Sequence, residues 1–230
     1  MKKIGLVGGT GPESTLMYYK DLNSKIDAIT GGKSMPDMTI ESVDFHKAID
    51  YVNSGQYDAL ADYLSEKVDN LVKSGAEVIS LTAGTMHIVI EEVERKTNVS
   101  LVSIPKAVCE KTVSMGLKKV GLLGTIPTME KDYMKKDLVD AGIEVVVPDK
   151  EDRERVAKRI FDELESGIVK DETLCEFNAI ISKMKQEQGI EAVILGCTEL
   201  PMLLNNGNCV LPCLDSVQIH IQKLIELALA

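Results

Sequence analysis

Hydrophobic and polar positions follow two periods along the chain. Short, mainly apolar runs without polar alternation at 3–8, 77–81, 119–123 and 189–196 are typical of parallel strands that are covered on both faces. Between these runs lie longer segments whose apolar residues recur at helical spacing, and 56–74 is the clearest of them. The two periods predict strands and helices that alternate.

The expected elements cover nearly the whole chain. The expected strands are 3–8, 38–43, 77–81, 101–104, 119–123, 144–147, the run that ends before Cys197, and 210–213. The expected helices are 13–29, 56–74, 86–96, 105–115, 129–141, 153–166, 171–187, a segment from Leu200 on, and 215–230. Residues 44–55 are expected to form a polar loop. This alternation predicts an α/β fold with a parallel sheet in each half.

The two halves of the sequence resemble each other. Residues 75–87 repeat the pattern of 189–201 with an offset of 114, and residues 2–10 resemble 118–125 with an offset of 116. Two matches at nearly one offset predict two similar domains related by a pseudo-two-fold axis, with the active site in the cleft between them. The expected domains are 1–104 plus 214–230, and 105–213.

Cys197 stands at the end of an apolar run and is a candidate reactive thiol. Thr198 and Glu199 follow it, and an expected helix begins at Leu200. Backbone N–H groups at a helix start are unpaired and stabilise negative charge, so this position favours a thiolate. The alternative is an inert core cysteine, since free cysteines are often buried. In the other half, the equivalent position is Ala83.

Composition limits the classes of partner. Apolar residues make up 44% of the chain and charged residues 27%, with no Trp, which indicates a globular protein with aliphatic cores. The formal net charge of −10 argues against a nucleic-acid partner, which clustered Lys and Arg would bind. No segment approaches the roughly 20 apolar residues that cross a bilayer. The first residues begin a strand rather than a signal peptide, so we expect a cytoplasmic protein with no membrane partner.

Neither metal nor nucleotide motifs are present. The glycines at 5–11 match neither the G-x-G-x-x-G pattern of dinucleotide sites nor a Walker motif, so no nucleotide cofactor is expected. The cysteines lack the spacing of a zinc site and are expected to be reduced thiols that bind no metal. They are Cys109, Cys175, Cys197, Cys209 and Cys213.

Glycine and threonine gather where four expected strands end, at 8–12, 82–87, 124–128 and 196–199. Open parallel sheets bind ligands at the carboxyl ends of their strands. Small residues leave room there, and hydroxyls donate hydrogen bonds to anionic groups. These loops therefore predict a small, polar, anionic substrate.

The motifs at 5–15, 83–87, 123–125, 196–199 and 211–215 together resemble the aspartate/glutamate racemase family of cofactor-independent amino-acid racemases, over the whole chain. The resemblance implies two facing doubly wound domains, a homodimer, independence of PLP and other cofactors, and a small dicarboxylic amino acid as substrate. It also implies racemisation by two opposed cysteines. One removes the α-proton as a thiolate, and the other returns a proton to the opposite face.

Cys197 matches the second cysteine of the family, and the first falls on Ala83, which has no proton to give. Three accounts of Ala83 stay open. It is an engineered replacement that leaves the chain inactive or impaired, or a hydroxyl of Thr82 or Thr85 takes the place of the thiol. In the third account, the chain is a one-thiol enzyme that protonates a single face, as the related arylmalonate decarboxylases do. Because Thr82 should point away from Ala83 along the strand, Thr85 or a water is the better substitute.

The resemblance also supplies substrate-binding candidates. It assigns the α-carboxylate and amino group of the substrate to Thr10, Thr85, Thr125 and Thr198, each of which is alternatively a helix cap. Gly84, where the family usually has Asn, enlarges the pocket.

Supporting roles follow from position. Glu199 and His87 lie just beyond two strand ends and would tune the thiol or its partner, while Lys47 and Lys170 are candidate cations for a distal carboxylate. No catalytic role is expected for His220. The leading hypothesis is an aspartate or glutamate racemase. The alternatives are a single-cysteine decarboxylase or single-face proton-transfer enzyme, and a catalytically silent protein that binds small acids.

Overall fold

The computed structural model describes residues 1–230, which form two compact units. Unit 1 comprises Met1–Ser103 and His220–Ala230, and unit 2 comprises Ile104–Ile219. The expected boundaries assign the whole closing helix to the first domain. The division between the units instead falls inside that helix, α11 (Ser216–Leu229).

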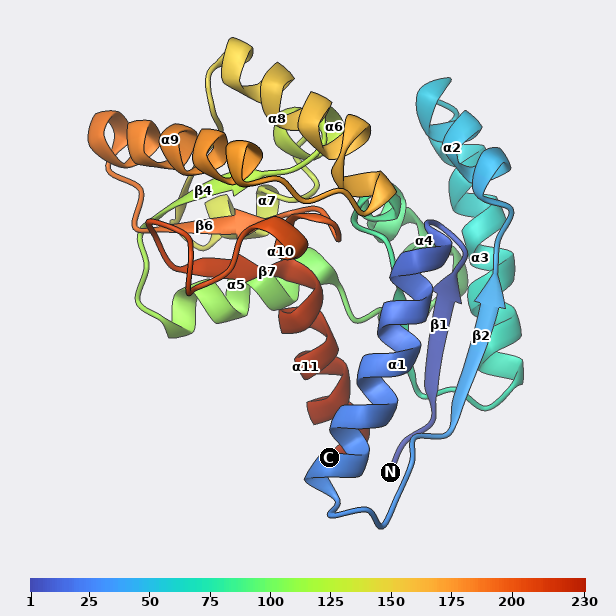
Figure 1. The fold of residues 1–230 in the computed structure, drawn as a ribbon. Coiled ribbons are helices and arrows are strands. Elements are labelled where there is room, and N and C mark those ends of the chain that lie inside the picture. The colour runs from blue at the N-terminus through green and yellow to red at the C-terminus, as the bar shows by residue number, and fades with distance from the viewer. The chain divides into compact units, whose positions relative to one another are not determined.

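Unit 1 is built on a parallel sheet with the strand order β2-β1-β3 (Figure 1). Its strands are β1 (Ile4–Gly8), β2 (Met38–Ser42) and β3 (Val78–Leu81). Its helical segments are α1 (Pro12–Ile29), α2 (Phe45–Asn53), α3 (Tyr57–Lys73), the 3₁₀ helix η1 (Gly84–Val89), α4 (Ile90–Thr97) and residues 220–229 of α11.

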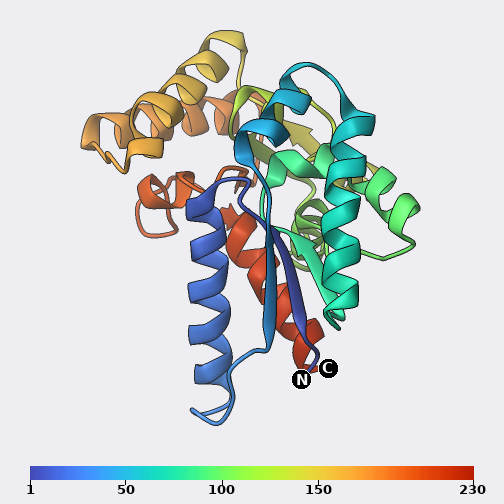
Figure 2. The ribbon, with the colours of Figure 1, turned by 90° about the vertical axis from the view of Figure 1, so that its right-hand side faces the viewer.

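Helices cover both faces of this sheet. Figures 1 and 2 show α1 beside α11 on one face and α3 on the other. The apolar stripe of α3, which includes Leu60, Leu64 and Val68, shares a core cluster with Leu81 of β3. Every residue of β1 and β3 is buried. The mainly apolar runs in the sequence are thereby explained, since neither face of these strands meets water.

A buried polar network joins α1, β3 and α11. The Nδ1 atom of His220 lies 2.6 Å from the Tyr18 hydroxyl. Its Nε2 atom lies 3.0 Å from Ser80 Oγ and 2.9 Å from the Val102 carbonyl. Burial lowers the pKa of His220 to about 3, so the ring is neutral and carries one N–H. Because a carbonyl only accepts, Nε2 donates and Nδ1 accepts from Tyr18. His220 therefore ties the closing helix to the sheet.

Unit 2 is built on a second parallel sheet, with the strand order β5-β4-β6-β7. Its strands are β4 (Lys119–Leu123), β5 (Glu144–Val146), β6 (Ala192–Leu195) and β7 (Cys213–Asp215). Its helical segments are α5 (Ile104–Ser114), α6 (Ile126–Glu130), α7 (Lys136–Asp140), α8 (Lys150–Asp162), the 3₁₀ helix η2 (Leu164–Ser166), α9 (Asp171–Gln188) and α10 (Leu200–Leu203).

The three strands of the first sheet, β2-β1-β3, correspond in order and register to β5-β4-β6 of the second, which adds β7 as a fourth strand. Gly5 pairs with Ile79 in unit 1, and Gly121 pairs with Val193 in unit 2. The offsets found in the sequence, 116 residues for the first strand and 114 for its neighbour, relate these two pairs. The internal repeat is therefore confirmed, and the chain has an α/β fold with two similar parallel sheets.

The structure corrects two predictions in unit 1. Residues 44–55 contain the helix α2 rather than a loop, because the side chain of Asp44 accepts hydrogen bonds from the first backbone N–H groups and caps the helix. The expected strand 101–104 is reduced to one bridge between Ser80 and Val102, since α5 begins directly afterwards.

Unit 2 differs from its prediction at two further places. The expected helix 129–141 is two short helices, since the backbone of Lys131 is extended and ends α6. The last strand begins at Cys213 instead of three residues earlier. Pro212 has no N–H to donate, and its carbonyl accepts from Val193, so the strand begins only after the proline.

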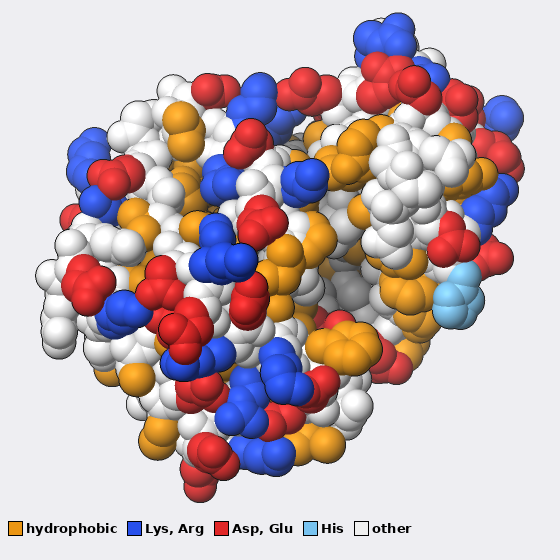
Figure 3. Space-filling model, turned by 90° about the horizontal axis from the view of Figure 1, so that it is seen from above, with side chains coloured by type: hydrophobic (Ala, Val, Ile, Leu, Met, Phe, Trp, Pro, Cys, Tyr) orange, Lys and Arg blue, Asp and Glu red, His pale blue; other side chains and the backbone are white.

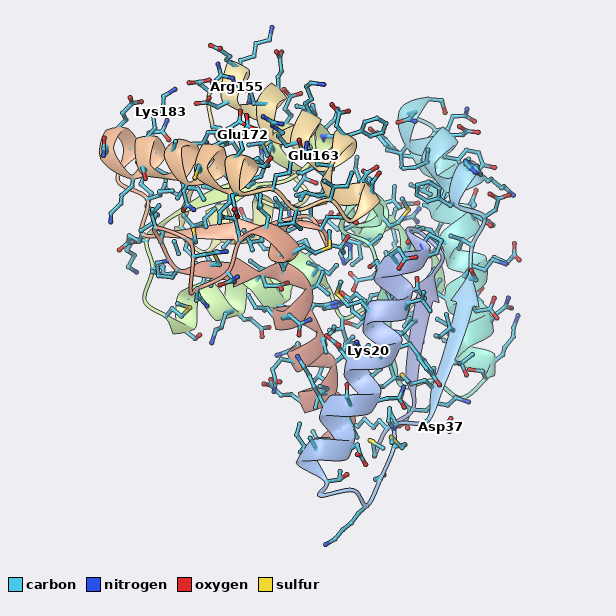
Figure 4. The ribbon with its side chains drawn as sticks, viewed as in Figure 1. Lys20, Asp37, Arg155, Glu163, Glu172 and Lys183 are labelled. Carbon is cyan, nitrogen blue, oxygen red and sulfur yellow. The ribbon has the colours of Figure 1, made fainter.

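Ion pairs join the helices of unit 2 (Figure 4). Glu163 lies between α8 and η2, where it is buried. Its carboxylate accepts from Thr173 Oγ1 at 2.5 Å and from Arg159 Nη1 at 2.6 Å, and Lys170 Nζ donates at 3.0 Å. These hydrogen bonds, that of Thr173 above all, lower the pKa of Glu163 to about 2. Lys183 of α9 pairs with two aspartates at the start of α8.

Charged side chains of both signs are interspersed on the face shown in Figure 3. The net charge of −10 is therefore not gathered into one patch on that face. None of the helices has the length and the apolar character needed to cross a membrane.

Candidate functional site

The end of β6 delivers Cys197 in a tightly packed turn. The N–H of Gly196 donates to the Leu123 carbonyl at 2.8 Å, which holds the turn against β4. A Cβ at Gly196 would lie 2.8 Å from the Thr128 methyl and 3.0 Å from the Leu123 oxygen. Only glycine fits between these atoms, so the residue before the thiol is fixed by packing.

The thiol of Cys197 donates a hydrogen bond to its neighbour Glu199. The Sγ atom lies 2.6 Å from Glu199 Oε2, and the Thr198 hydroxyl lies 2.6 Å from Oε1. Burial raises the pKa of the Cys197 thiol well above its usual range, and the negative charge of Glu199 and the hydrogen bond raise it further. In this structure the residue is therefore a neutral thiol whose proton faces a carboxylate.

The expectation of a stabilised thiolate at Cys197 is therefore wrong for this structure. It rested on a helix that begins just after the cysteine, but α10 spans only Leu200–Leu203. A single turn aligns few peptide dipoles. The carboxylate of Glu199 stands much closer and carries a full charge of opposite effect.

Glu165 brings a second carboxyl group near the pair. It lies in η2, and burial together with the charge of Glu199 raises its pKa. The charge of Glu165 in turn contributes to the raised pKa of Cys197. The sequence did not single out Glu165, because nothing in the local pattern shows that η2 lies near the end of β6.

Hydroxyl groups line the end of the neighbouring strand β4. Thr125 Oγ1 lies 3.0 Å from Thr128 Oγ1, which in turn lies 3.0 Å from the Tyr133 hydroxyl. Thr128 also packs against Gly124, where a Cβ would lie 2.7 Å from its methyl group. Thr128 thus holds the ends of β4 and β6 together. It belongs to the loop 124–128 that the sequence marked, whereas no sequence pattern singled out Tyr133.

In unit 1, the end of β3 carries Ala83 where unit 2 has the thiol. The backbone of Ala83 is extended, and η1 begins directly after it. The expected helix 86–96 is two elements in the structure, because the 3₁₀ helix η1 runs to Val89 and α4 begins at Ile90. His87 is buried, and its Nδ1 atom lies 3.0 Å from the Ala83 carbonyl. Because a carbonyl only accepts, Nδ1 carries the proton. His87 therefore fixes the backbone of Ala83.

The ends of β1 and β3 are joined through α1. Ser14 Oγ donates to the Thr82 carbonyl at 2.7 Å, and the N–H of Gly9 donates to Thr15 Oγ1 at 2.9 Å. The Thr82 hydroxyl, which is fully buried, donates to the Val7 carbonyl at 3.2 Å. Thr82 is thus engaged in the core, as the strand alternation predicted.

The helix-cap alternative for the four candidate threonines is wrong. Thr125 occupies a cap position, but its side chain makes no capping hydrogen bond. Thr10, Thr85 and Thr198 are not cap residues at all, since Gly11, Ala83 and Glu199 hold those positions. Thr10 Oγ1 is buried and has no hydrogen-bond partner within the protein. A buried hydroxyl without a partner is rare and costly, which makes Thr10 a candidate ligand contact.

No contact of the two candidate lysines with the strand-end groups is among those described, and Gly84 and Thr85 follow directly after Ala83. Gly84 and Thr85 form the first turn of η1. Lys47 Nζ lies 4.3 Å from the centre of the Tyr63 ring, and Lys170 is a donor to Glu163. No group of three or more His, Cys, Asp or Glu side chains is close enough together to hold a metal ion.

Comparisons with known proteins agree on one family. The sequence model of the family described as Asp/Glu/hydantoin racemase matches residues 7–224. The chain is 24% identical over 218 residues to the broad-specificity amino-acid racemase RacX of Bacillus subtilis, a match that covers 93% of this chain and 92% of that protein.

Solved structures give the same result. The structure of a candidate Asp/Glu racemase from Yersinia pestis has a TM-score of 0.95 at 35% identity, and that of an aspartate racemase homologue from Pyrococcus horikoshii has a TM-score of 0.89 at 40% identity. Each comparison covers 100% of both chains. An unliganded arylmalonate decarboxylase shares the fold alone, with a TM-score of 0.59 at 13% identity over 99% of this chain and 93% of that one.

Proposed function

This chain belongs to the Asp/Glu/hydantoin racemase family, and we propose that it moves a proton at the α-carbon of aspartate or glutamate without a cofactor. Cys197 supplies the acid/base group. The observation that carries the proposal is the hydrogen bond from the Cys197 thiol to Glu199 at a strand end. Members of the family are racemases, and a buried thiol beside a carboxylate is a pair that can both give and take a proton.

Cys197 and Glu199 play different parts when the thiol acts as an acid and when it acts as a base. As an acid, the neutral thiol of Cys197 gives its proton to the α-carbanion, and the raised pKa of the thiol keeps that proton in place until the carbanion forms. As a base, the thiol first passes its proton to Glu199 Oε2, 2.6 Å away. The thiolate then removes the α-proton of the substrate.

Inversion of the α-carbon requires a second group on the opposite face, and Ala83 cannot supply it. Thr82 is a poor substitute, because its hydroxyl is bound to the Val7 carbonyl in the core. We assign the second role to the Thr85 hydroxyl or a water that it positions. A hydroxyl is a far weaker acid than a thiol, so this chain is expected to invert its substrate much more slowly than it exchanges the α-proton.

Ala83 itself favours a second candidate function. An enzyme with one thiol protonates a single face of its substrate, which is the chemistry of a decarboxylase or of another single-face proton transfer. The two candidates share Cys197 and differ only in whether any inversion occurs.

Substrate binding is assigned from the hydroxyl groups at the strand ends. The unpaired hydroxyl of Thr10 supports a contact to the α-carboxylate. Thr198 donates to Glu199 and keeps its lone pairs for the amino group. Lys170 is a candidate cation for a distal carboxylate, because Glu163 retains Thr173 and Arg159 when Lys170 turns away.

The test is exchange in heavy water. Each enantiomer of aspartate and of glutamate is incubated separately with the protein, and proton NMR follows the loss of the α-proton while chiral chromatography follows inversion. We expect exchange with at least one enantiomer, and the Cys175→Ser variant, which removes an exposed thiol, to match the wild type. Loss of α-carboxylate as CO₂ from a malonate analogue identifies the second candidate. Binding without exchange or decarboxylation contradicts both.

A further inference from the structure

A chain of three hydroxyl groups leads from Tyr133 to the end of β4. Thr128 Oγ1 stands in the middle of this chain, 3.0 Å from the Tyr133 hydroxyl and 3.0 Å from Thr125 Oγ1. Thr128 is buried, while Thr125 and Tyr133 are partly exposed. The chain therefore connects Tyr133, in the loop between α6 and α7, to a threonine at a strand end through a residue that is closed to solvent.

The middle residue of the chain is fixed beside the proposed reactive group. A Cβ at Gly124 would lie 2.7 Å from the Thr128 methyl, and a Cβ at Gly196 would lie 2.8 Å from the same methyl. The methyl is thus held between the ends of β4 and β6, so that the Thr128 hydroxyl keeps one direction. Gly196 directly precedes Cys197. Thr125 therefore stands at the strand end next to the one that carries the thiol.

Unit 1 packs its first strand end without such a chain. Thr15 lies against Gly8, where a Cβ would be 2.6 Å from the Thr15 methyl. The Thr15 hydroxyl accepts from the N–H of Gly9 at 2.9 Å and donates to the Gly11 carbonyl at 3.3 Å. It serves the backbone, whereas Thr128 bonds to two side-chain hydroxyls. Packing of a strand end therefore does not by itself require a row of hydroxyl groups.

The three hydroxyl protons have a preferred direction. Each hydroxyl has one proton to donate, so the row donates either toward Thr125 or toward Tyr133. A phenol is more acidic than an alcohol and is the stronger donor, which favours donation from Tyr133 to Thr128 and from Thr128 to Thr125. The Thr125 proton then points out of the chain, and each bond in the row polarises the next O–H.

From this geometry we propose that Tyr133 is a positioning residue, which acts through Thr128 to make the Thr125 hydroxyl a donor to a carboxylate of the substrate. The inference rests on the proposed function, because it names the substrate group that Thr125 holds in that site. The partner is a carboxylate and not the amino group, since a carboxylate accepts hydrogen bonds and an ammonium group only donates them.

The experiment measures binding and exchange in Tyr133→Phe, which removes the hydroxyl and keeps the ring. Titration calorimetry with L-aspartate and with succinate, which has both carboxylates but no amino group, gives the two affinities. We expect both to fall by about 3–10-fold, the worth of one hydrogen bond. In the exchange assay KM should rise by the same factor while kcat changes less than twofold, because Cys197 and Glu199 are untouched. Tyr19→Phe, which alters an exposed tyrosine of α1, is the matched control.

A second variant separates the chain from general loss of structure. Thr128→Val removes the middle hydroxyl and keeps a methyl group for the two glycines. It should weaken succinate binding by a similar factor, and the losses in Thr128→Val and Tyr133→Phe should not add in the double variant, because they break one chain. Thermal unfolding of each variant shows that the fold is kept.

The outcomes distinguish this inference from the proposed function. It is overturned if Tyr133→Phe binds succinate as tightly as the wild type, if only aspartate binding weakens, or if kcat falls in place of a rise in KM. If the wild type binds both acids but exchanges no α-proton, the proposed function is wrong, and the affinities still test the hydroxyl chain. A wild type that binds neither acid and exchanges no proton overturns both.

Discussion

The ends of β3 and β6 occupy equivalent places in their two sheets but differ in chemistry. Each strand pairs with the first strand of its unit in the same register, and each ends in a short loop before a helical turn. In unit 2, that loop presents a thiol bound to a carboxylate. In unit 1, it presents a methyl group, and the Nδ1 atom of the nearby His87 bonds to the backbone carbonyl of Ala83.

Different residues determine the packing of the strand ends and the reactive group that each strand end carries. The glycines and threonines that pack the strand ends are present in both halves, as Gly8 against Thr15 and Gly124 against Thr128 show. The reactive group depends on one side chain, Cys197, which takes no part in these glycine–threonine contacts. A duplicated fold can therefore keep the packing of both strand ends while only one half keeps its acid/base group.

The largest effect is expected from removing the thiol. Cys197→Ala should lower the rate of α-proton exchange by about 10²–10⁴-fold, the range of general acid/base catalysis, because the proposed role of Glu199 is to exchange a proton with the thiol and not with the α-carbon. Proton NMR in heavy water measures the rate, and Cys175→Ser is the control. Exchange at the wild-type rate in Cys197→Ala would show that another residue carries the chemistry.

Restoring the missing group tests the other half of the comparison. Ala83→Cys should raise the rate of inversion, measured by chiral chromatography, by roughly 10²-fold or more, since a thiol replaces a hydroxyl or water as acid. Ala83→Ser is the matched control of similar size. An unchanged inversion rate in Ala83→Cys means that position 83 does not reach the α-carbon.

The carboxylate at the strand end is expected to matter less. Glu199→Gln keeps the shape but removes the charge, and it should slow exchange by about 10–100-fold, the worth of a charged hydrogen bond. It should also lower the pKa of the Cys197 thiol, because the charge of Glu199 raises it. The pH dependence of iodoacetamide alkylation at Cys197 reports this shift. A pKa that stays the same or rises would contradict the assignment of Glu199.

A further effect concerns stability in unit 1. Because His220 has a pKa of about 3 in the folded protein against about 6.5 when unfolded, the unfolded chain binds the extra proton between these values. Stability is therefore complete above pH 6.5 and falls as the pH drops toward 3. His220→Gln should cost about 2 kcal/mol at neutral pH and flatten that acid dependence, as urea unfolding at several pH values would show. An equally steep profile in the variant would exclude His220.

The sequence predicted the architecture well because burial leaves a regular trace. The apolar runs and the 114-residue offset located β3 and β6 and aligned Ala83 with Cys197. The helix α2 was missed although Asp44 is an ordinary N-cap residue and Ala48, Ile49 and Val52, which pack on the core of unit 1, follow it at helical spacing.

The electrostatics of the site could not be predicted in the same way. The pKa of the Cys197 thiol depends on the position of the Glu199 side chain and on the charge of Glu165. Glu165 is far from Cys197 in the sequence. Neither is encoded in local periodicity. The same holds for His220, which the sequence placed outside catalysis without showing that it links Tyr18 and Ser80 in the core.

The most direct test of the account compares exchange with inversion in the unmodified chain. L- and D-aspartate are incubated separately in heavy water, and the rate of α-deuterium incorporation is divided by the rate of inversion for each enantiomer. A single thiol at position 197 predicts that one enantiomer exchanges many times faster than it inverts. Equal rates of exchange and inversion for both enantiomers would contradict the account, because they require two matched acid/base groups.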